Sequence, residues 1–203
     1  MEQQYLTIRK IFAFVFPHTR LNRSLRILVA INAVFVFIVG LFAPFYAVFV
    51  QKIGGNIAFA GLSWAIFLIV GGILIFLFSN WGLKIKEQEL LIALGYILTG
   101  GVFLSYAFMA SIAQLIVTQI LWGVAAALRS PAFDSVYSNH TTQENSLVEW
   151  GQWEGIAAIV TGIAALVGGL FIQAFGYAVI FLIMAATSFF LGIYIIRLPR
   201  DVL

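Results

Sequence analysis

The sequence contains no cysteine and little charge, and both absences narrow what the protein can be. Among its 203 residues there is no Cys, and only 9% are Asp, Glu, Lys or Arg. Without Cys the chain can form neither a disulfide framework nor a thiolate metal site. A soluble domain usually carries about 25% charged residues. Because 63% of the residues are hydrophobic, too little polar surface remains for water, and lipid must surround most of the chain.

Motifs of intramembrane enzymes are missing as well. The two histidines, His18 and His140, lie outside the long apolar runs. The sequence contains neither a His-Glu-x-x-His zinc motif nor the Gly-x-Ser-Gly of an intramembrane serine protease. We therefore expect no enzyme activity, no metal and no cofactor. The basic residues are not gathered into one face, so nucleic acid is not an expected partner.

Long apolar runs predict an all-α membrane protein with six transmembrane helices. Each run is close to the roughly 20 residues that a helix needs to cross a bilayer, and backbone groups in hydrocarbon must bond within the helix. Pro131, just after Arg129, is expected to bend or stop the fourth helix. Residues 27–203 then form the membrane domain, with spans at 27–50, 58–79, 89–109, 111–129, 153–174 and 177–196.

The distribution of Lys and Arg predicts the orientation. Ten of the 11 basic residues lie in the N-terminal tail, the second-to-third and fourth-to-fifth connections and the C-terminal tail, whereas Lys52 lies on the other side. Cytoplasmic segments are enriched in Lys and Arg. We therefore expect a multi-pass protein of the cell (plasma or inner) membrane with both termini in the cytoplasm.

Residues 1–26 form a cytoplasmic segment of different character. Ile8, Phe12 and Phe16 lie close to one helical face, with Arg9 and Lys10 beside them. This pattern is typical of a short amphipathic helix in the membrane interface. A tail without fixed structure is the alternative.

Three stretches carry a resemblance to a known family. They are Leu41-Phe-Ala-Pro-Phe-Tyr46 with Ile53-Gly-Gly and Ala60-Gly61; Leu115–Ala127 leading into Arg129-Ser-Pro-Ala132; and Thr161–Gly169 followed by Gly176-Tyr177. Their order and spacing, over six helices with both ends inside, resemble the N-terminal six-helix half of a major facilitator superfamily transporter. The resemblance implies that the six helices form two inverted three-helix repeats.

The departures from that family's motifs concern charge. The acidic residue of the second-to-third loop would fall near Leu83, although Lys84 and Lys86 keep part of the positive charge. Gln119 stands four residues before Gly123, where proton-coupled members have Arg, and Ala164–Ala165 stand where antiporters have Gly-Pro. These differences weaken the interpretation as a drug/proton antiporter.

The middle of each span is free of ionisable residues, which predicts a neutral cavity without a carboxylate proton relay. In the resembled fold the first and fourth helices line the central cavity. The polar and aromatic residues of these helices are therefore our substrate-cavity candidates: Asn32, Gln114, Thr118, Gln119 and Trp122. The alternative is that they hydrogen-bond between helices and serve packing. The expected substrate is a small neutral or amphipathic solute, moved by alternating access.

Two further groups of residues are singled out by position. Ion pairs at the cytoplasmic ends of the helices form the expected gate, from Lys84, Lys86, Arg129, Asp134 and Glu154; a static anchor is the alternative role for Arg129. Small residues that let helices approach closely form a stripe in the fifth span: Ala158, Gly162, Ala165 and Gly169. That stripe serves either an interface between two halves or packing within one half.

The resembled family has about twelve spans in two parallel halves, and this chain supplies one half. We expect a second copy of the chain to complete the transporter as a parallel homodimer in the lipid bilayer. A separate six-span half, encoded elsewhere, is one alternative. A binding or scaffold protein that transports nothing is another.

Overall fold

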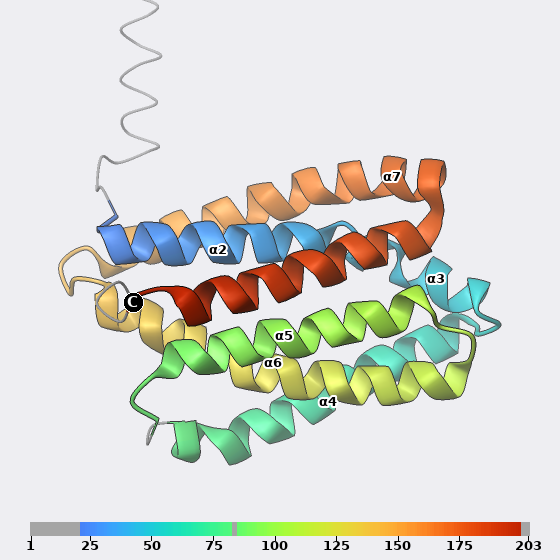
Figure 1. Ribbon diagram of the computed structural model, residues 1–203, viewed down its shortest axis with the longest axis horizontal. Coiled ribbons are helices and arrows are strands. Elements are labelled where there is room, and N and C mark those ends of the chain that lie inside the picture. Colours follow the sequence, from blue (N-terminus) through green and yellow to red (C-terminus); the bar gives the residue numbers. More distant parts are fainter. Residues whose placement is uncertain (1–20, 83–84, 200–203) are drawn as a thin grey trace, which may run out of the picture.

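The computed structural model describes residues 21–82 and 85–199, without the side chains of residues 79–82. The described residues fold into helices joined by short turns (Figure 1). In chain order these are α2 (Arg23–Gly40), the 3₁₀ helix η1 (Ala43–Phe45), α3 (Tyr46–Lys52), α4 (Ile57–Gly82), α5 (Gln88–Ala107), α6 (Ile112–His140) and α7 (Ser146–Arg197). The expected interfacial helix at the N-terminus lies outside the described residues.

Five helical segments are long and apolar enough to cross a membrane, when Arg23–Lys52 is counted as one. Polar side chains cap the starts of three of them, and at α4 the Asn56 side chain accepts a hydrogen bond from the Phe59 backbone N–H at 2.8 Å. The Asn22 side chain accepts a hydrogen bond from the Leu25 backbone N–H at 2.8 Å, and Ser111 accepts one from Gln114 at 3.2 Å. Such caps satisfy backbone N–H groups that have no partner inside the helix.

The longest helix, α7, consists of two arms. Gly176 has φ 77° and ψ 178°, which is non-helical and lies in a region that glycine adopts without steric cost. There the chain turns back on itself, so residues 146–175 and 177–197 run in opposite directions (Figure 1). The predicted fifth and sixth spans correspond to these two arms.

The first predicted span is broken rather than continuous. Pro44 lies in η1, and a proline inside a helix removes one backbone donor and clashes with the preceding turn. Backbone hydrogen bonds between residues three apart replace the α-helical bonds between residues four apart. They run from the Phe42 N–H to the Val39 carbonyl at 3.2 Å and from the Phe45 N–H to the Phe42 carbonyl at 2.8 Å. Helices α2 and α3 are therefore separate pieces of one crossing.

The fourth helix does not stop at its proline, which was one of the two expected effects of Pro131. Helix α6 continues through Pro131 to His140. Packing holds the extension, because Phe133 lies 5.2 Å from the Trp153 ring and the Tyr137 hydroxyl donates to the Glu149 carbonyl at 2.6 Å. Burial of these aromatic residues offsets the hydrogen bond that proline removes.

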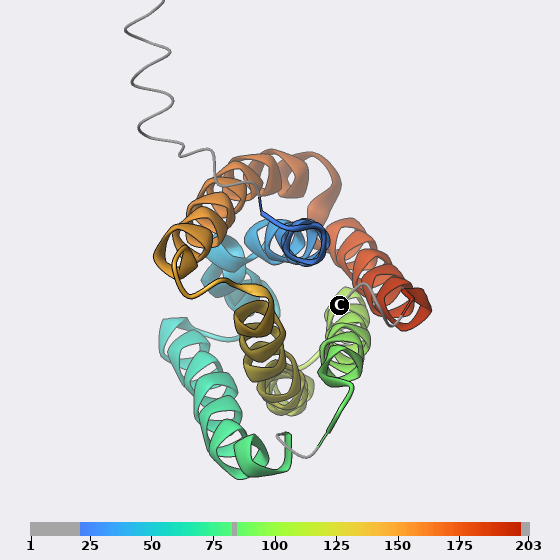
Figure 2. The ribbon, with the colours of Figure 1, turned by 90° about the vertical axis from the view of Figure 1, so that its left-hand side faces the viewer.

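The helices pack closely where glycine faces a neighbouring backbone. Figure 2 shows α6 between α4 and α5, and α2 between the two arms of α7. A Cβ at Gly123 of α6 would lie only 2.9 Å from the Phe67 carbonyl oxygen of α4. A Cβ at Gly168 of α7 would collide with the Leu41 carbonyl at the end of α2. These close helix crossings are possible only because Gly123 and Gly168 have no side chain.

Aromatic side chains fill the core near α3, at the end of the bundle that carries Lys52. Phe181 lies 4.7 Å from Phe42, 5.0 Å from Phe49 and 5.2 Å from Tyr106, measured between ring centres. We call this the Lys52 end, and the end where α2 begins the Arg23 end. The aromatic cluster joins the break after α2, helices α3 and α5 and the second arm of α7, and it fixes the broken first span against its neighbours.

Candidate functional site

A chain of hydrogen bonds connects α6, α3 and α4 inside the bundle. The Gln119 side-chain amide donates to the Tyr46 hydroxyl, and Tyr46 shares a 2.6 Å hydrogen bond with the Ser63 hydroxyl. Ser63 in turn donates to the Phe59 carbonyl at 2.8 Å. All three polar side chains are buried. We call Tyr46, Ser63 and Gln119 the polar cluster.

The direction of these bonds leaves one acceptor of the polar cluster unused. A hydroxyl has a single hydrogen. Ser63 gives its hydrogen to a backbone carbonyl, so Tyr46 donates to Ser63 and accepts from Gln119. The Gln119 carbonyl oxygen then has no donor, and it is a buried polar atom without a hydrogen-bond partner. An unpaired buried acceptor costs about 1–3 kcal/mol, so this oxygen is available to a further hydrogen-bond donor.

Aromatic rings surround the polar cluster. Tyr46 lies 5.3 Å from Trp64, and Trp122 lies 5.9 Å from Trp64 and 4.7 Å from Phe67, between ring centres. Trp122 and Gln119 are on neighbouring positions of the same face of α6. The surroundings are therefore apolar except for the cluster itself, which strengthens any hydrogen bond made there.

Two of the sequence-predicted cavity residues bond elsewhere. The Thr118 hydroxyl donates to the Gln114 carbonyl at 2.8 Å and lies 2.9 Å from the Ser105 hydroxyl. The Gln114 amide donates to Ser105 at 3.4 Å. Their polar atoms thus connect α6 to α5, as helix-packing hydrogen bonds do in membranes.

Asn32 belongs to a third group, closer to the Arg23 end. It accepts a hydrogen bond from the Tyr96 hydroxyl at 2.8 Å, and the Arg129 guanidinium lies 3.5 Å away. Arg129 also stacks on the Phe35 ring at 4.4 Å. A cation over an aromatic face is stabilised by the negative face of the ring. The structure therefore gives Arg129 partners within the bundle and does not show it as a lone anchor at a helix end.

Of the other gate candidates in the described part of the chain, Asp134 is the one that interacts with the charge of Arg129. Asp134 and Glu154 are exposed, and Asp134 lies close enough to both Arg129 and Glu154 to interact with their charges. Lys86 is exposed, and Lys84 lies outside the described residues. Whether these residues gate a cavity stays a prediction.

The stripe of small residues is divided between two surroundings. Ala158 and Gly162 are exposed, and a Cβ at Gly162 would meet nothing within 4 Å. Ala165 is half-buried, and Gly169 packs on the Phe45 ring. The closest approach of α7 to α2 uses the neighbouring residues Ala164 and Gly168 instead.

Sequence reasoning did not single out Tyr46, Ser63, Tyr96 or Ser105 as partners of the candidate residues. Gln119 and Tyr46 are 73 residues apart in the chain, and Asn32 and Tyr96 are 64 apart. The available signal was weak: Ser63 is an isolated hydroxyl at the start of the apolar run of α4. A single polar residue in an apolar helix is expected to have a hydrogen-bond partner, but the sequence does not identify that partner.

The comparisons with known proteins agree with the all-helical, apolar architecture. A search of curated proteins finds no match to the chain. A family profile, that of the Major Facilitator Superfamily, matches residues 28–202. That range begins in α2 and covers every described helix after it. The chain is thus a multi-pass membrane protein, and it belongs to the Major Facilitator Superfamily, whose members are membrane transporters in general.

Proposed function

We propose that the chain transports a small neutral or amphipathic solute by alternating access, and that the solute binds at the polar cluster. The observation that carries this proposal is the unpaired, buried Gln119 carbonyl oxygen, in a cluster whose Tyr46 ring packs on Trp64. It offers a hydrogen-bond acceptor in an apolar site without formal charge. A solute with one donor group and an apolar body matches that chemistry.

The break in the first span gives the solute a route to this site. Gln119 is 0% exposed, so α3 must move away from α6 before anything can reach it. Tyr46 is the first residue of α3 and directly follows η1. Discontinuous helices form the binding sites of many transporters. Movement of α3 about η1 would break the bond between Tyr46 and Gln119 and free the amide for the solute.

We further propose that six helical spans, the two arms of α7 each crossing once, form two inverted three-helix repeats with both termini in the cytoplasm. Two close helix crossings support this: Gly168 brings the fifth span against the first, and Gly123 brings the fourth against the second. In an inverted pair of three-helix repeats these two contacts are equivalent. A second copy in the same orientation then completes the transporter as a parallel homodimer.

Reconstitution into liposomes tests the site. The panel consists of labelled neutral and amphipathic solutes, and the variants are Gln119→Leu and, as the matched control, Gln51→Leu at an exposed position. We expect saturable transport of at least one solute by the unmodified chain and by Gln51→Leu. Gln119→Leu should fold, because it removes an unpaired acceptor, and should lose transport of that solute.

Two results would contradict the proposal. If Gln119→Leu transports as well as the unmodified chain, the solute does not bind at the polar cluster. If no solute in the panel moves, the chain is a binding or scaffold protein, or it needs a separate six-span half. Co-expression with a partner half restores transport only in the last case.

A further inference from the structure

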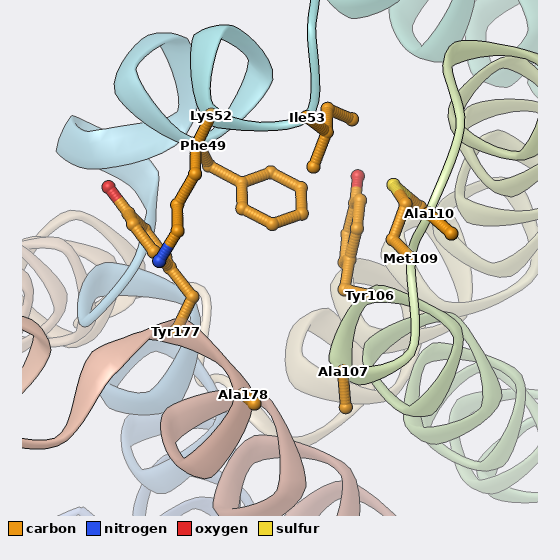
Figure 3. A pocket seen from close by; sticks show the side chains of 9 residues that line it. All are labelled: Phe49, Lys52, Ile53, Tyr106, Ala107, Met109, Ala110, Tyr177 and Ala178. Atoms are coloured by element: carbon orange, nitrogen blue, oxygen red, sulfur yellow. The ribbon is translucent and has the colours of Figure 1, made fainter.

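An open cavity of about 420 Å³ lies at the Lys52 end, between α3, α5 and the second arm of α7. It is distinct from the polar cluster. In Figure 3, Lys52 and Tyr177 stand on one side, Tyr106 and Met109 on the other, and the Phe49 ring projects between them. Its volume falls within the range of small-molecule sites, roughly 300–1,000 Å³. Aromatic rings and a thioether form part of the wall, and polar atoms form a slightly larger part of its exposed surface.

Lys52 is the one charged residue in the lining of this cavity, and no acidic residue in the described part of the chain lies at its end of the bundle. Its ammonium nitrogen lies 5.4 Å from the centre of the Tyr177 ring, so the side chain is directed over the aromatic wall. The acidic residues at 87, 89, 134, 144, 149 and 154 belong to the start of α5, the last turns of α6, the connection to α7 and the first turns of α7. These segments lie at the opposite end of the bundle (Figure 1). Among the described residues no carboxylate is placed to pair with Lys52, so its charge is available to another molecule.

The cavity also presents an unused hydrogen-bond donor. Tyr106 is 2% exposed, lines the cavity, and has a hydroxyl without a hydrogen-bond partner. In Figure 3 that hydroxyl lies at the edge of the cavity, between Ile53 and Met109 and across from Lys52. A buried hydroxyl is normally paired. The cavity thus combines one cation, one unpaired hydroxyl at its edge and a wall that is partly aromatic.

We propose that this cavity binds an amphipathic anion, the anionic phospholipid of the membrane leaflet at the Lys52 end. The phosphate lies at the Lys52 ammonium, an ester oxygen accepts the Tyr106 hydroxyl proton, and the apolar part of the molecule covers Phe49 and Met109. The cavity is open, so the remaining acyl chains stay in the bilayer. Binding here joins α3 to α5 and to α7, and it stabilises the end of the broken first span.

Purified full-length chain in a neutral detergent tests the proposal. The probes are short-chain phosphatidylglycerol, phosphatidylcholine with the same acyl chains, dodecyl phosphate and inorganic phosphate. Native mass spectrometry counts bound molecules, and the thermal unfolding midpoint measures their effect. We expect phosphatidylglycerol to bind and to raise the midpoint, and phosphatidylcholine and inorganic phosphate to have no effect. Dodecyl phosphate distinguishes a phospholipid site from a site for any amphipathic anion. If it binds as tightly as phosphatidylglycerol, the site accepts any amphipathic anion, and the proposal of a phospholipid is overturned.

Variants locate the site. Lys52→Gln should weaken the tightest phosphatidylglycerol binding about fivefold, the effect of one lysine near anionic lipid, and Lys52→Arg should restore it. Lys86→Gln, an exposed lysine at the Arg23 end, is the matched control and should bind like the unmodified chain. Tyr106→Phe should weaken binding without abolishing it. Equal binding by Lys52→Gln, or equal stabilisation by phosphatidylcholine, would overturn the proposal, and neither result depends on transport.

Discussion

The Tyr46 hydroxyl is the central member of the polar cluster, since it accepts from Gln119 and donates to Ser63. Tyr46→Phe removes both bonds and leaves the whole Gln119 amide unpaired in an apolar site. We expect a loss of about 1–3 kcal/mol in the free energy of unfolding, measured as a lower thermal unfolding midpoint in detergent. Tyr194→Phe is the control, because Tyr194 is 42% exposed and should unfold like the unmodified chain.

A double variant shows whether the Gln119 amide is the reason. In the Gln119→Leu background there is no side-chain amide that could lose its partner. Tyr46→Phe should therefore lower the free energy of unfolding clearly less in that background. Equal costs in the two backgrounds would mean that the two side chains do not interact, and the hydrogen-bond chain described above would be wrong. Coupling of this kind is what a double-mutant cycle measures.

At the scale of single residues, the sequence predicts which side chains matter better than what they do. Gln119 and Trp122 are conspicuous as polar and aromatic residues in an apolar helix, and the structure brings them together. Thr118 is equally conspicuous, yet its hydroxyl is used by Gln114 and Ser105. The difference arises from which neighbour each face of α6 meets. That depends on helix packing between distant segments and is not encoded in local sequence.

At the scale of elements, the contact between α7 and α2 depends on Gly168. A Cβ there would collide with the Leu41 backbone, which belongs to the break in the first span and cannot move as a flexible side chain could. We expect Gly168→Ala to destabilise the protein by about 1–3 kcal/mol, as overpacking does, with a lower unfolding midpoint in detergent. Gly162→Ala is the matched control, since a Cβ there meets nothing within 4 Å. A similar midpoint for both variants would contradict the close crossing.

Pro44, inside the predicted first span, and Pro131, just after the predicted fourth, show the limit of element prediction. Pro44 separates α2 from α3, whereas α6 passes through Pro131. The local cost of proline is alike in both places. Beyond Pro131 the chain buries Phe133 and Tyr137 against the start of α7, and that packing sustains the helix. The existence and apolar character of the helices could be predicted from sequence, but the breaks could not, because distant packing decides them.

At the scale of the whole molecule, the family and the membrane architecture follow from patterns spread along the entire chain. Apolar runs, motif order and charge bias each extend over most of its length, so local errors do not remove them. The family match over residues 28–202 confirms the resemblance seen in the sequence. The partner of the chain, in contrast, cannot be predicted from such patterns. A surface that packs on lipid and one that packs on a second copy are both apolar, so composition does not distinguish them.

The proposed homodimer is tested by single cysteines, which are unambiguous because the chain has no Cys. Gly162 lies on the open face of the first arm of α7, and Gly101 lies on an equally open face of α5. In the parallel dimer the first α7 arm faces the second copy and α5 faces lipid. Under mild oxidation in membranes we expect Gly162→Cys to form a disulfide-linked dimer on denaturing gels and Gly101→Cys to stay monomeric. A disulfide needs Cα atoms within about 7 Å, so random collision in the bilayer gives little product. Linkage through Gly101→Cys alone would place α5 at the interface and would rule out the dimer proposed here.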